Sequence, residues 1–216
     1  METSSSPTRR RILPALAAAA LLGLAGAGWL AASRGPAFHG TTYDDVTPAP
    51  ELSLVDHAGR PAALRDFRGR AVLLFFGFTH CPDVCPLTLA KLARVTESLG
   101  ARPEELAVLL VTVDPERDTP AALGEYVRRF TPLAVGLTGD SASLARAYRG
   151  YGVYTVPGTT HGGGHAGKHA PAAPAGAMTH STAVYGIDRE GRLQVVMSPG
   201  ASEDDLRDDV RTLLSL

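Results

Sequence analysis

The chain has 216 residues, 44% of them hydrophobic, and a formal net charge of −1 at pH 7. This length supports one well-buried domain, and the near-zero charge, with no basic patch beyond residue 11, argues against nucleic acid as a partner. Only two cysteines are present, which excludes a small scaffold held together by several disulfides.

The N-terminal segment, residues 1–33, has the pattern of an export signal or a membrane anchor. Three arginines at 9–11 precede an uncharged stretch at 12–33 that is rich in Ala, Leu and Gly. As a helix, ~21 apolar residues would span roughly 30 Å, about one hydrocarbon core. Arginines on one side only predict a cytoplasmic N-terminus and an extracytoplasmic domain at a bacterial-type cell membrane. The length favours a retained single-pass anchor, whereas cleavage near 25–27 would give a secreted or periplasmic protein.

Strand and helix signals begin after a spacer. Residues 34–50 mix Pro, Gly, Thr and Asp without periodicity, which is typical of a linker. A small hairpin is then expected to turn at 56–59. The continuous apolar run at 71–78 predicts a central strand covered on both faces. A helix is predicted over 86–99, and Gly100 is expected to end it.

The alternation of strands and helices repeats in the second half. A buried strand is predicted at 106–113. A helix is expected to follow Asp118-Thr119-Pro120, with Asp118 and Thr119 as capping residues and a proline in the first turn. The remaining elements are a short strand at 134–139, a helix begun by Ser141 or Ser143, strands at 181–188 and 192–198 joined as a hairpin, and an amphipathic helix at 202–216. This order predicts an α/β fold over residues 51–216, with a mixed sheet and helices on both faces.

The two cysteines lie at the junction between the strand at 71–78 and the helix at 86–99. Cys81 and Cys85 are four positions apart, so in a helix their sulfurs share one face. A helix N-terminus stabilises a thiolate and lowers its pKa, and the thiolate both attacks disulfides and binds metals. The pair could therefore form a disulfide, bind a soft metal ion, or alternate between these states.

The spacing separates the redox interpretation from the metal interpretation. The common disulfide-exchange motif has two intervening residues, whereas three intervening residues suit chelation of one ion. Cu(I) prefers thiolates with one imidazole, while zinc would need a fourth ligand in a closed site. His180, just before the strand predicted at 181–188, is the candidate third ligand, although a lone histidine at such a junction is more often solvated. His80, next to Cys81, is expected to have a structural role.

Several motifs occur together in one order: FGFTHCPDVCPLTLAKL, VTVDPERDTP, GLTGD, AYRGYGVY and HSTAVYGIDREGRL. Together they closely resemble the Sco/SenC family of membrane-tethered, thioredoxin-like copper proteins. The resemblance covers residues 51–216. It implies a thioredoxin-like fold, with a central mixed sheet flanked by helices, preceded by an N-terminal transmembrane or signal helix. It also implies that Cys81, Cys85 and His180 bind one copper ion, as Cu(I) and in an alternative as Cu(II).

The resemblance implies a copper metallochaperone rather than an enzyme. The expected partner is cytochrome c oxidase subunit II or a similar copper-receiving protein, in which the dinuclear copper centre is assembled. The alternative is a thiol–disulfide reductase that keeps the copper-site cysteines of the oxidase reduced, which would need only Cys81 and Cys85. A peroxiredoxin-like peroxidase fits less well, because cysteines four positions apart do not match the widely separated pair common there.

Two features depart from the family pattern. Thr179 stands where members commonly carry an acidic residue before the distal histidine, so a contact to His180 is expected to differ. The segment at 155–179 is long, rich in Gly, Ala and Pro, and without apolar periodicity, which predicts a mobile loop. It carries three histidines that are candidates for weak copper capture, although Gly-rich linkers also acquire histidines without a role: His161, His165 and His169.

Overall fold

The computed structural model of the protein describes residues 37–43, 45–154 and 183–216. The chain divides into two compact units, Met1–Ala37 and Phe38–Leu216. The predicted leader at 1–33 and the loop predicted at 155–179 lie outside the described residues. Within the described ranges, no helix has the length and apolar character needed to cross a membrane.

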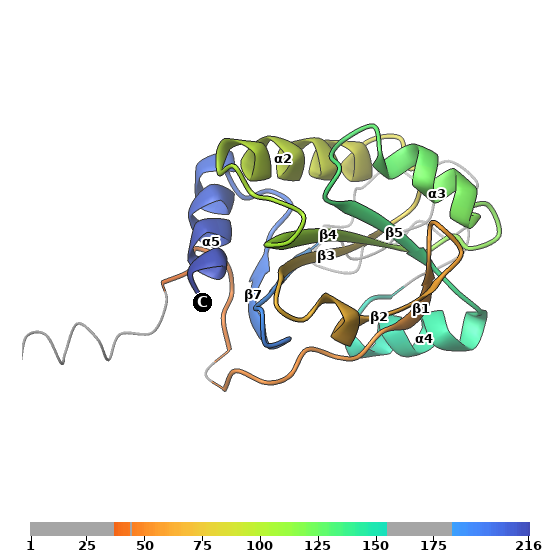
Figure 1. Cartoon of the computed structure of the whole chain (residues 1–216), viewed down its shortest axis with the longest axis horizontal. Coiled ribbons are helices and arrows are strands. Elements are labelled where there is room, and N and C mark those ends of the chain that lie inside the picture. Colours follow the sequence, from red (N-terminus) through yellow and green to blue (C-terminus); the bar gives the residue numbers. More distant parts are fainter. Residues whose placement is uncertain (1–36, 44, 155–182) are drawn as a thin grey trace, which may run out of the picture. The chain divides into compact units, whose positions relative to one another are not determined.

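One mixed sheet forms the centre of the second unit (Figure 1). Within the described residues its strands are β1 (Ser53–Asp56), β2 (Pro61–Ala63), β3 (Ala71–Gly77), β4 (Leu106–Thr112), β5 (Ala134–Thr138), β6 (Val184–Ile187) and β7 (Leu193–Met197). They lie in the order β2-β1-β5-β4-β3-β6-β7. The pairs β3–β4 and β4–β5 are parallel, and the other neighbours are antiparallel.

The central strands β3 and β4 are buried along their whole lengths. They pair in parallel from Ala71 opposite Leu106 to Gly77 opposite Thr112. Both strands are continuous apolar runs, because helices cover both faces of the sheet and neither side of either strand faces water. The predictions of two buried central strands and of a mixed α/β sheet are confirmed.

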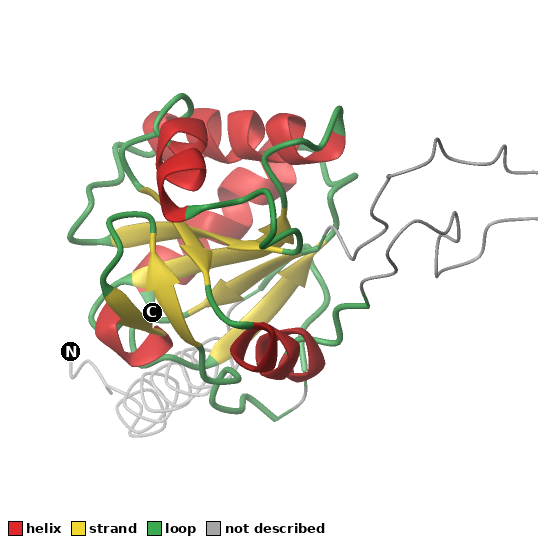
Figure 2. Cartoon of the chain, turned by 90° about the vertical axis from the view of Figure 1, so that its right-hand side faces the viewer, coloured by secondary structure: helices red, strands yellow, loops and turns green. Residues whose placement is uncertain are grey.

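Helices pack on both faces of this sheet (Figure 2). They are α2 (Val84–Ser98), α3 (Pro120–Val127), α4 (Ser141–Gly150) and α5 (Glu203–Ser215), with a short 3₁₀ turn η1 (Leu64–Phe67). Figure 1 shows α2 and α3 above the central strands and α4 below them. Alternate side chains of β3 therefore enter different core clusters. Leu73 and Phe75 pack with residues of α2, α3 and α5, whereas Leu74 and Phe76 pack with residues of α4.

The helix starts are close to those predicted from the sequence. Helix α2 begins at Val84, two positions earlier than expected, which places Cys85 inside its first turn. The Thr119 side chain caps α3 by accepting a hydrogen bond from a backbone N–H of the first turn, as predicted. Helix α4 begins at Ser141, but its cap is the preceding Asp140, whose carboxylate accepts the third N–H of the helix at 2.7 Å.

Part of the segment interpreted as a linker, residues 34–50, is attached to the folded unit. Thr41 exchanges backbone hydrogen bonds of 2.9 and 2.8 Å with β7. The successive backbone N–H groups at 39–40 donate to the carboxylate of Asp209 in α5, at 2.6 and 3.0 Å. Asp209 is buried, so these bonds satisfy a charge that would otherwise be costly. The folded unit begins at Phe38.

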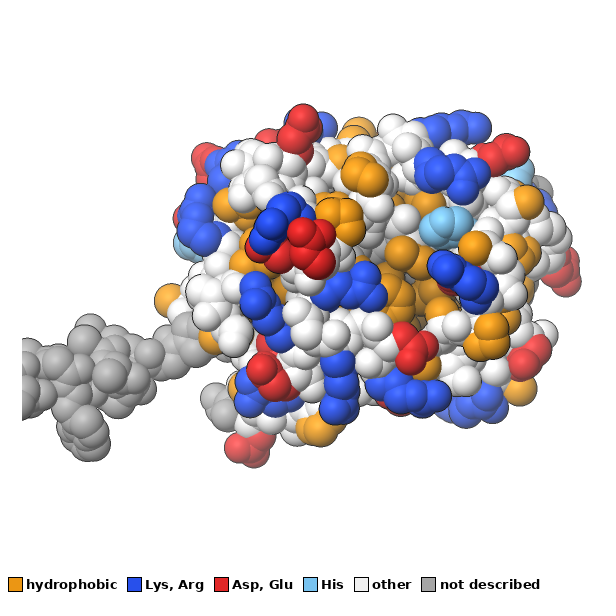
Figure 3. Space-filling model, viewed as in Figure 1, with side chains coloured by type: hydrophobic (Ala, Val, Ile, Leu, Met, Phe, Trp, Pro, Cys, Tyr) orange, Lys and Arg blue, Asp and Glu red, His pale blue; other side chains and the backbone are white. Residues whose placement is uncertain are grey.

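Charged side chains on the surface are paired with one another. On α5, Arg207 pairs with Asp204 and Arg211 pairs with Asp208, each across one helical turn. On the face drawn in Figure 3, acidic and basic side chains are interspersed rather than gathered by sign. This distribution agrees with the near-zero net charge of the sequence.

Candidate metal centre

The two cysteines lie where the central strand β3 ends and helix α2 begins. The turn after β3 is closed by a hydrogen bond of 3.2 Å from the backbone N–H of Cys81 to the carbonyl oxygen of Phe78. Cys85 is in the first turn of α2 and is 1% exposed, whereas Cys81 precedes the helix and is half-buried. The fold thus brings these two predicted site residues together, and Cys81 is the more accessible.

A hydrogen bond links the cysteines at the helix N-terminus. The backbone N–H of Cys85 donates to the sulfur of Cys81 at 3.4 Å, and both side chains are thiols. Donors in the first turn have no partner within their own helix. Asp83, at the N-cap position, makes no capping bond with its side chain. The Cys81 sulfur therefore takes up a helix-start donor, where negative charge on the sulfur would be stabilised.

The thiol of Cys85 holds its proton tightly. A hydrogen bond with the Cys81 side chain, followed by burial, raises the pKa of Cys85 well above its usual range. The prediction that the helix N-terminus lowers the thiol pKa is therefore wrong for Cys85. The hydrogen bond with Cys81 and the burial of the sulfur outweigh the stabilisation that a helix N-terminus gives to a thiolate.

Gly77, the last residue of β3, leaves the space that the Cys85 sulfur occupies. A Cβ atom on Gly77 would lie 2.7 Å from that sulfur and 3.1 Å from a methyl carbon of Leu110. A carbon cannot approach a sulfur so closely, so any other residue would displace Cys85. Gly77 was not predicted from the sequence as a site residue, although a glycine at the end of an apolar strand can indicate a close approach.

A fully buried carboxylate fixes the turn that leads to Cys81. Asp118 accepts hydrogen bonds from the backbone N–H of Thr79 at 3.1 Å, the Thr79 hydroxyl at 2.5 Å and the Thr112 hydroxyl at 2.6 Å. Thr112 ends β4 and Thr79 follows β3, so one carboxylate joins the ends of two neighbouring strands. The predicted capping role is correct only for Thr119, because the Asp118 carboxylate faces the cysteine turn instead.

Two further polar residues near the cysteine turn make local contacts. His80 is exposed, and its Nδ1 lies 2.9 Å from the Thr79 hydroxyl oxygen. The Asp114 carbonyl oxygen accepts the backbone N–H groups of Arg117 and Asp118 at 3.2 and 2.9 Å. The Asp114 carboxylate also pairs with Arg117. The contacts of Asp114 stabilise the turn between β4 and α3.

His180 lies outside the described residues, but the strand that follows it is described. β6 runs antiparallel to β3, with its first residue Val184 opposite Phe75. The start of β6 is therefore beside the end of β3 that leads to the cysteine turn. Within the described ranges, no three His, Cys, Asp or Glu side chains are grouped closely enough to hold a metal ion. The loop histidines also lie outside those ranges: His161, His165 and His169.

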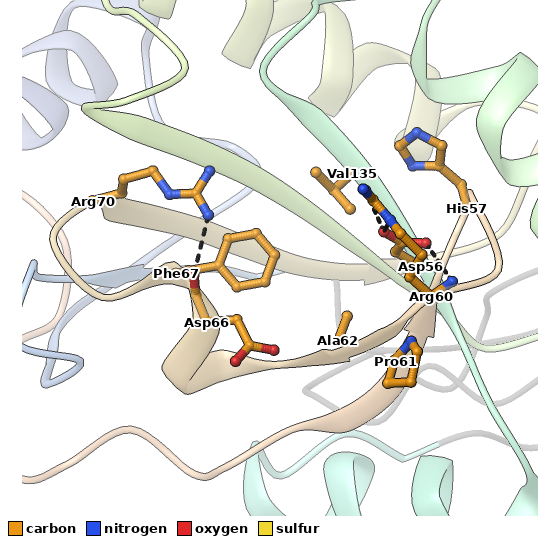
Figure 4. Close-up of a pocket in the computed structure, with 9 residues that line it drawn as sticks. All are labelled: Asp56, His57, Arg60, Pro61, Ala62, Asp66, Phe67, Arg70 and Val135. Carbon is orange, nitrogen blue, oxygen red and sulfur yellow. Dashed lines mark hydrogen bonds and ion pairs between the residues drawn. The ribbon is translucent and has the colours of Figure 1, made fainter.

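A cavity of about 380 Å³ lies at the β1–β2 hairpin (Figure 4). The charged groups that line it are already paired. Arg60 forms an ion pair with Asp56 at 2.8 Å, and Arg70 lies over the ring of Phe67, 4.7 Å from its centre, and donates to the carbonyl oxygen of Asp66. These side chains therefore already have partners, and neither cysteine lines the cavity.

A protein-family model matches most of the chain. The family model described as SCO1/SenC matches residues 44–215. The chain belongs to the SCO1/SenC family. It is 40% identical over 163 residues to the mitochondrial SCO2 homolog of Bos taurus, which covers 74% of this chain and 58% of that protein. The chain therefore spans only a little more than half the length of this curated relative.

Solved structures of SCO1/SenC proteins share the fold. Apo Sco1 from Thermus thermophilus is 33% identical, with a TM-score of 0.67, and the match covers 83% of this chain and 98% of that one. Bradyrhizobium japonicum ScoI with copper bound is 29% identical, with a TM-score of 0.63, covering 77% and 99%. These likenesses confirm the predicted thioredoxin-like α/β fold.

The close approach of Gly77 to Cys85 gives a testable consequence in this SCO1/SenC protein. Gly77→Ala places a methyl group where the Cys85 sulfur lies, so we expect the free energy of unfolding to fall by about 1–3 kcal/mol. We also expect weaker binding of thiol-seeking metal ions. Chemical denaturation of the reduced protein measures the first effect and metal titration the second.

The matched control is Gly200→Ala, because a Cβ atom there would meet nothing closer than 3.6 Å. We expect both quantities to be unchanged in that variant. Unaltered metal binding by Gly77→Ala would show that the Cys85 sulfur is not held at this position.

Proposed function

We propose that this protein binds one copper ion, as Cu(I), through Cys81, Cys85 and His180, and delivers it to a copper-receiving protein. The observation that carries the proposal is the pair of thiols at the N-terminus of α2, where the backbone N–H of Cys85 donates to the Cys81 sulfur. Support comes from the family, since the related Bradyrhizobium japonicum ScoI and yeast Sco1 structures are described as having copper bound.

The donor set fits a soft metal ion. Two adjacent sulfurs suit Cu(I), which accepts low coordination numbers and prefers thiolate and imidazole ligands. A site of two sulfurs and one imidazole leaves room for an entering ligand, which transfer of the ion requires. Cys81 is the more exposed of the two sulfurs, so we infer that the receiving protein attacks on its side.

The third ligand is proposed from the chain topology. His180 precedes Val184 by a short segment, and Val184 lies opposite Phe75 near the cysteine end of β3. A chain extends by at most ~3.3–3.6 Å per residue. This reach of roughly 14 Å allows the imidazole to approach the sulfurs from the neighbouring strand. Thr179, beside this histidine, would then provide a hydroxyl rather than the acidic group common in the family.

The receiving partner is proposed to be cytochrome c oxidase subunit II or a similar protein, with its dinuclear copper centre as destination. Two large apolar side chains are exposed next to the cysteines, Val84 at 37% and Leu87 at 62%. Exposed apolar side chains beside a reactive pair are typical of a surface that another protein covers. We further propose that residues 1–33 anchor the domain at the extracytoplasmic face of a bacterial-type membrane.

Cu(I) competition titration of the reduced protein tests the proposed site. We expect one tightly bound Cu(I) in the wild type and a large loss of affinity in Cys81→Ser, Cys85→Ser and His180→Ala. His57→Ala is the matched histidine control, because that ring accepts a hydrogen bond from Gly136 of β5, two strands away from β3. Undiminished Cu(I) affinity in His180→Ala would rule out the three-ligand site.

The reductase alternative predicts a different result for the same variants. It needs only the two cysteines, so thiol–disulfide exchange would survive in His180→Ala while Cu(I) affinity fell. In that reaction Cys81 would be the attacking group, because it is the more exposed sulfur and accepts a backbone N–H at the helix start.

The proton on Cys85 predicts a pH dependence of copper binding. Below its raised pKa this thiol is protonated, and the metal must displace the proton to bind the sulfur. We therefore expect Cu(I) affinity to rise with pH, by about tenfold per pH unit for each proton released. Titrations at three pH values between roughly 6 and 8 measure this slope. An affinity that does not change with pH would contradict the assignment of Cys85 as a ligand.

The exposed apolar side chain of Leu87 is expected to affect the rate of copper transfer to the partner and not the affinity for Cu(I). We expect Leu87→Asp to slow copper transfer to the purified copper-binding domain of the oxidase subunit and to leave Cu(I) affinity unchanged. Val46→Asp is the control, because Val46 is also exposed but lies in the segment at 34–50 that precedes β1. Equal transfer rates in the two variants would argue against Leu87 as a contact with the partner.

A further inference from the structure

The hydroxyl of Tyr126 in α3 is buried without a hydrogen-bond partner among the described residues. Buried tyrosine hydroxyls nearly always have a partner, because desolvating the group without one costs stability. An orphaned polar group of this kind needs an explanation, and one explanation is a partner that is absent in the state described. The question is which group could accept this hydrogen bond.

Two packing contacts hold the side chain of Tyr126 in place. Its ring meets the ring of Phe130 edge-on, with 5.3 Å between the centres. The side chain also packs against the core cluster that includes Phe75 of β3 and Leu89 of α2. These contacts restrain the ring, so the direction of the hydroxyl is set by packing and not by a hydrogen bond.

The Cys85 sulfur and the Tyr126 side chain share core neighbours. A Cβ atom on Gly77 would lie 2.7 Å from that sulfur, 3.1 Å from Leu110 and 3.3 Å from Phe75. Leu110 and Phe75 belong to the cluster against which Tyr126 packs.

The electrostatics of the hydroxyl agree with this placement. Burial raises the pKa of Tyr126, and negative charge on Cys85, on Cys81 and on Asp118 raises it further, with Cys85 the strongest of the three. The hydroxyl therefore keeps its proton at physiological pH and remains a donor. A thiol is a weak acceptor, whereas a thiolate is charged and accepts a strong hydrogen bond.

Hydrogen bonds connect the start of α3 to the turn that precedes Cys81. Thr119 caps α3, and the adjacent Asp118 holds Thr79 through two hydrogen bonds. Figure 1 shows α3 next to the end of α2 at which that helix begins. The helix that carries Tyr126 and the turn that carries Cys81 are thus fixed by one set of bonds.

We propose that Tyr126 is a positioning residue that donates a hydrogen bond to the Cys85 sulfur when that sulfur is a copper-bound thiolate. This inference rests on the proposed function. As the metal binds, the Cys85 proton leaves to solvent, the sulfur becomes a strong acceptor, and the unpaired hydroxyl gains its partner. Hydrogen bonds to a ligating sulfur stabilise the ligand and tune the metal.

Tyr126→Phe separates this role from a purely structural one. Removing an unpaired buried hydroxyl should leave the melting temperature of the reduced, metal-free full chain unchanged or higher. The same change should weaken Cu(I) binding by about tenfold or more, the value of a hydrogen bond to a charged group. It should also shift the ultraviolet charge-transfer band of the Cu(I)–thiolate, which a structural role would not move.

Tyr151→Phe is the matched control. The Tyr151 hydroxyl donates to the carbonyl oxygen of Pro50 at 2.8 Å, so it already has a partner without copper. We expect the opposite pattern there, with a lower melting temperature and unchanged Cu(I) affinity. All variants are purified as the full chain in detergent and titrated with Cu(I) alone.

Two results would overturn the inference. Equal Cu(I) affinity in the wild type and Tyr126→Phe would show that the hydroxyl makes no bond to the bound thiolate. A lower melting temperature of metal-free Tyr126→Phe would show that the hydroxyl already has a partner without copper. Failure of the wild type itself to bind Cu(I) is a separate result, which would overturn the proposed function and with it this role.

Discussion

The buried carboxylate of Asp118 is the interaction on which the site depends. It accepts three hydrogen bonds from Thr79 and Thr112, at the ends of two parallel strands. Without these donors, burying the charge would cost several kcal/mol, roughly the whole stability of a small domain. A different path of the turn after β3 would remove the Thr79 donors and leave this buried charge underpaired. Because α3 begins at the next residues, the same carboxylate also sets the position of that helix.

This anchoring explains how two sulfurs of different character are placed together. Cys85 is pressed against β3, where only a glycine at position 77 leaves room for it, and its thiol keeps its proton. Cys81 is half-exposed and accepts a backbone N–H at the helix start. A buried sulfur suits retention of a metal ion, and an exposed one suits its transfer. The hydroxyl of Tyr126 in α3 is buried and unpaired among the described residues.

Local signals in the sequence predicted much of this arrangement. The continuous apolar runs of β3 and β4 and the Thr119-Pro120 start of α3 are short-range patterns, and the structure follows them. The cysteine spacing identified the reactive pair. The role of Asp118 could not be predicted, because Thr79 is 39 positions away and an aspartate before a helix resembles a cap. Gly77 and Tyr126 were missed for the same reason: their roles depend on contacts between segments that meet only in the folded chain.

The central claim is that two thiolates and one imidazole hold the copper ion. X-ray absorption at the copper edge of the reduced, Cu(I)-loaded full chain tests it most directly, because the spectrum reports the number and kind of neighbouring atoms. The account predicts a three-coordinate ion with two sulfur neighbours and one nitrogen neighbour, and loss of the nitrogen in His180→Ala. A two-coordinate ion with sulfur neighbours only in the wild type would contradict it.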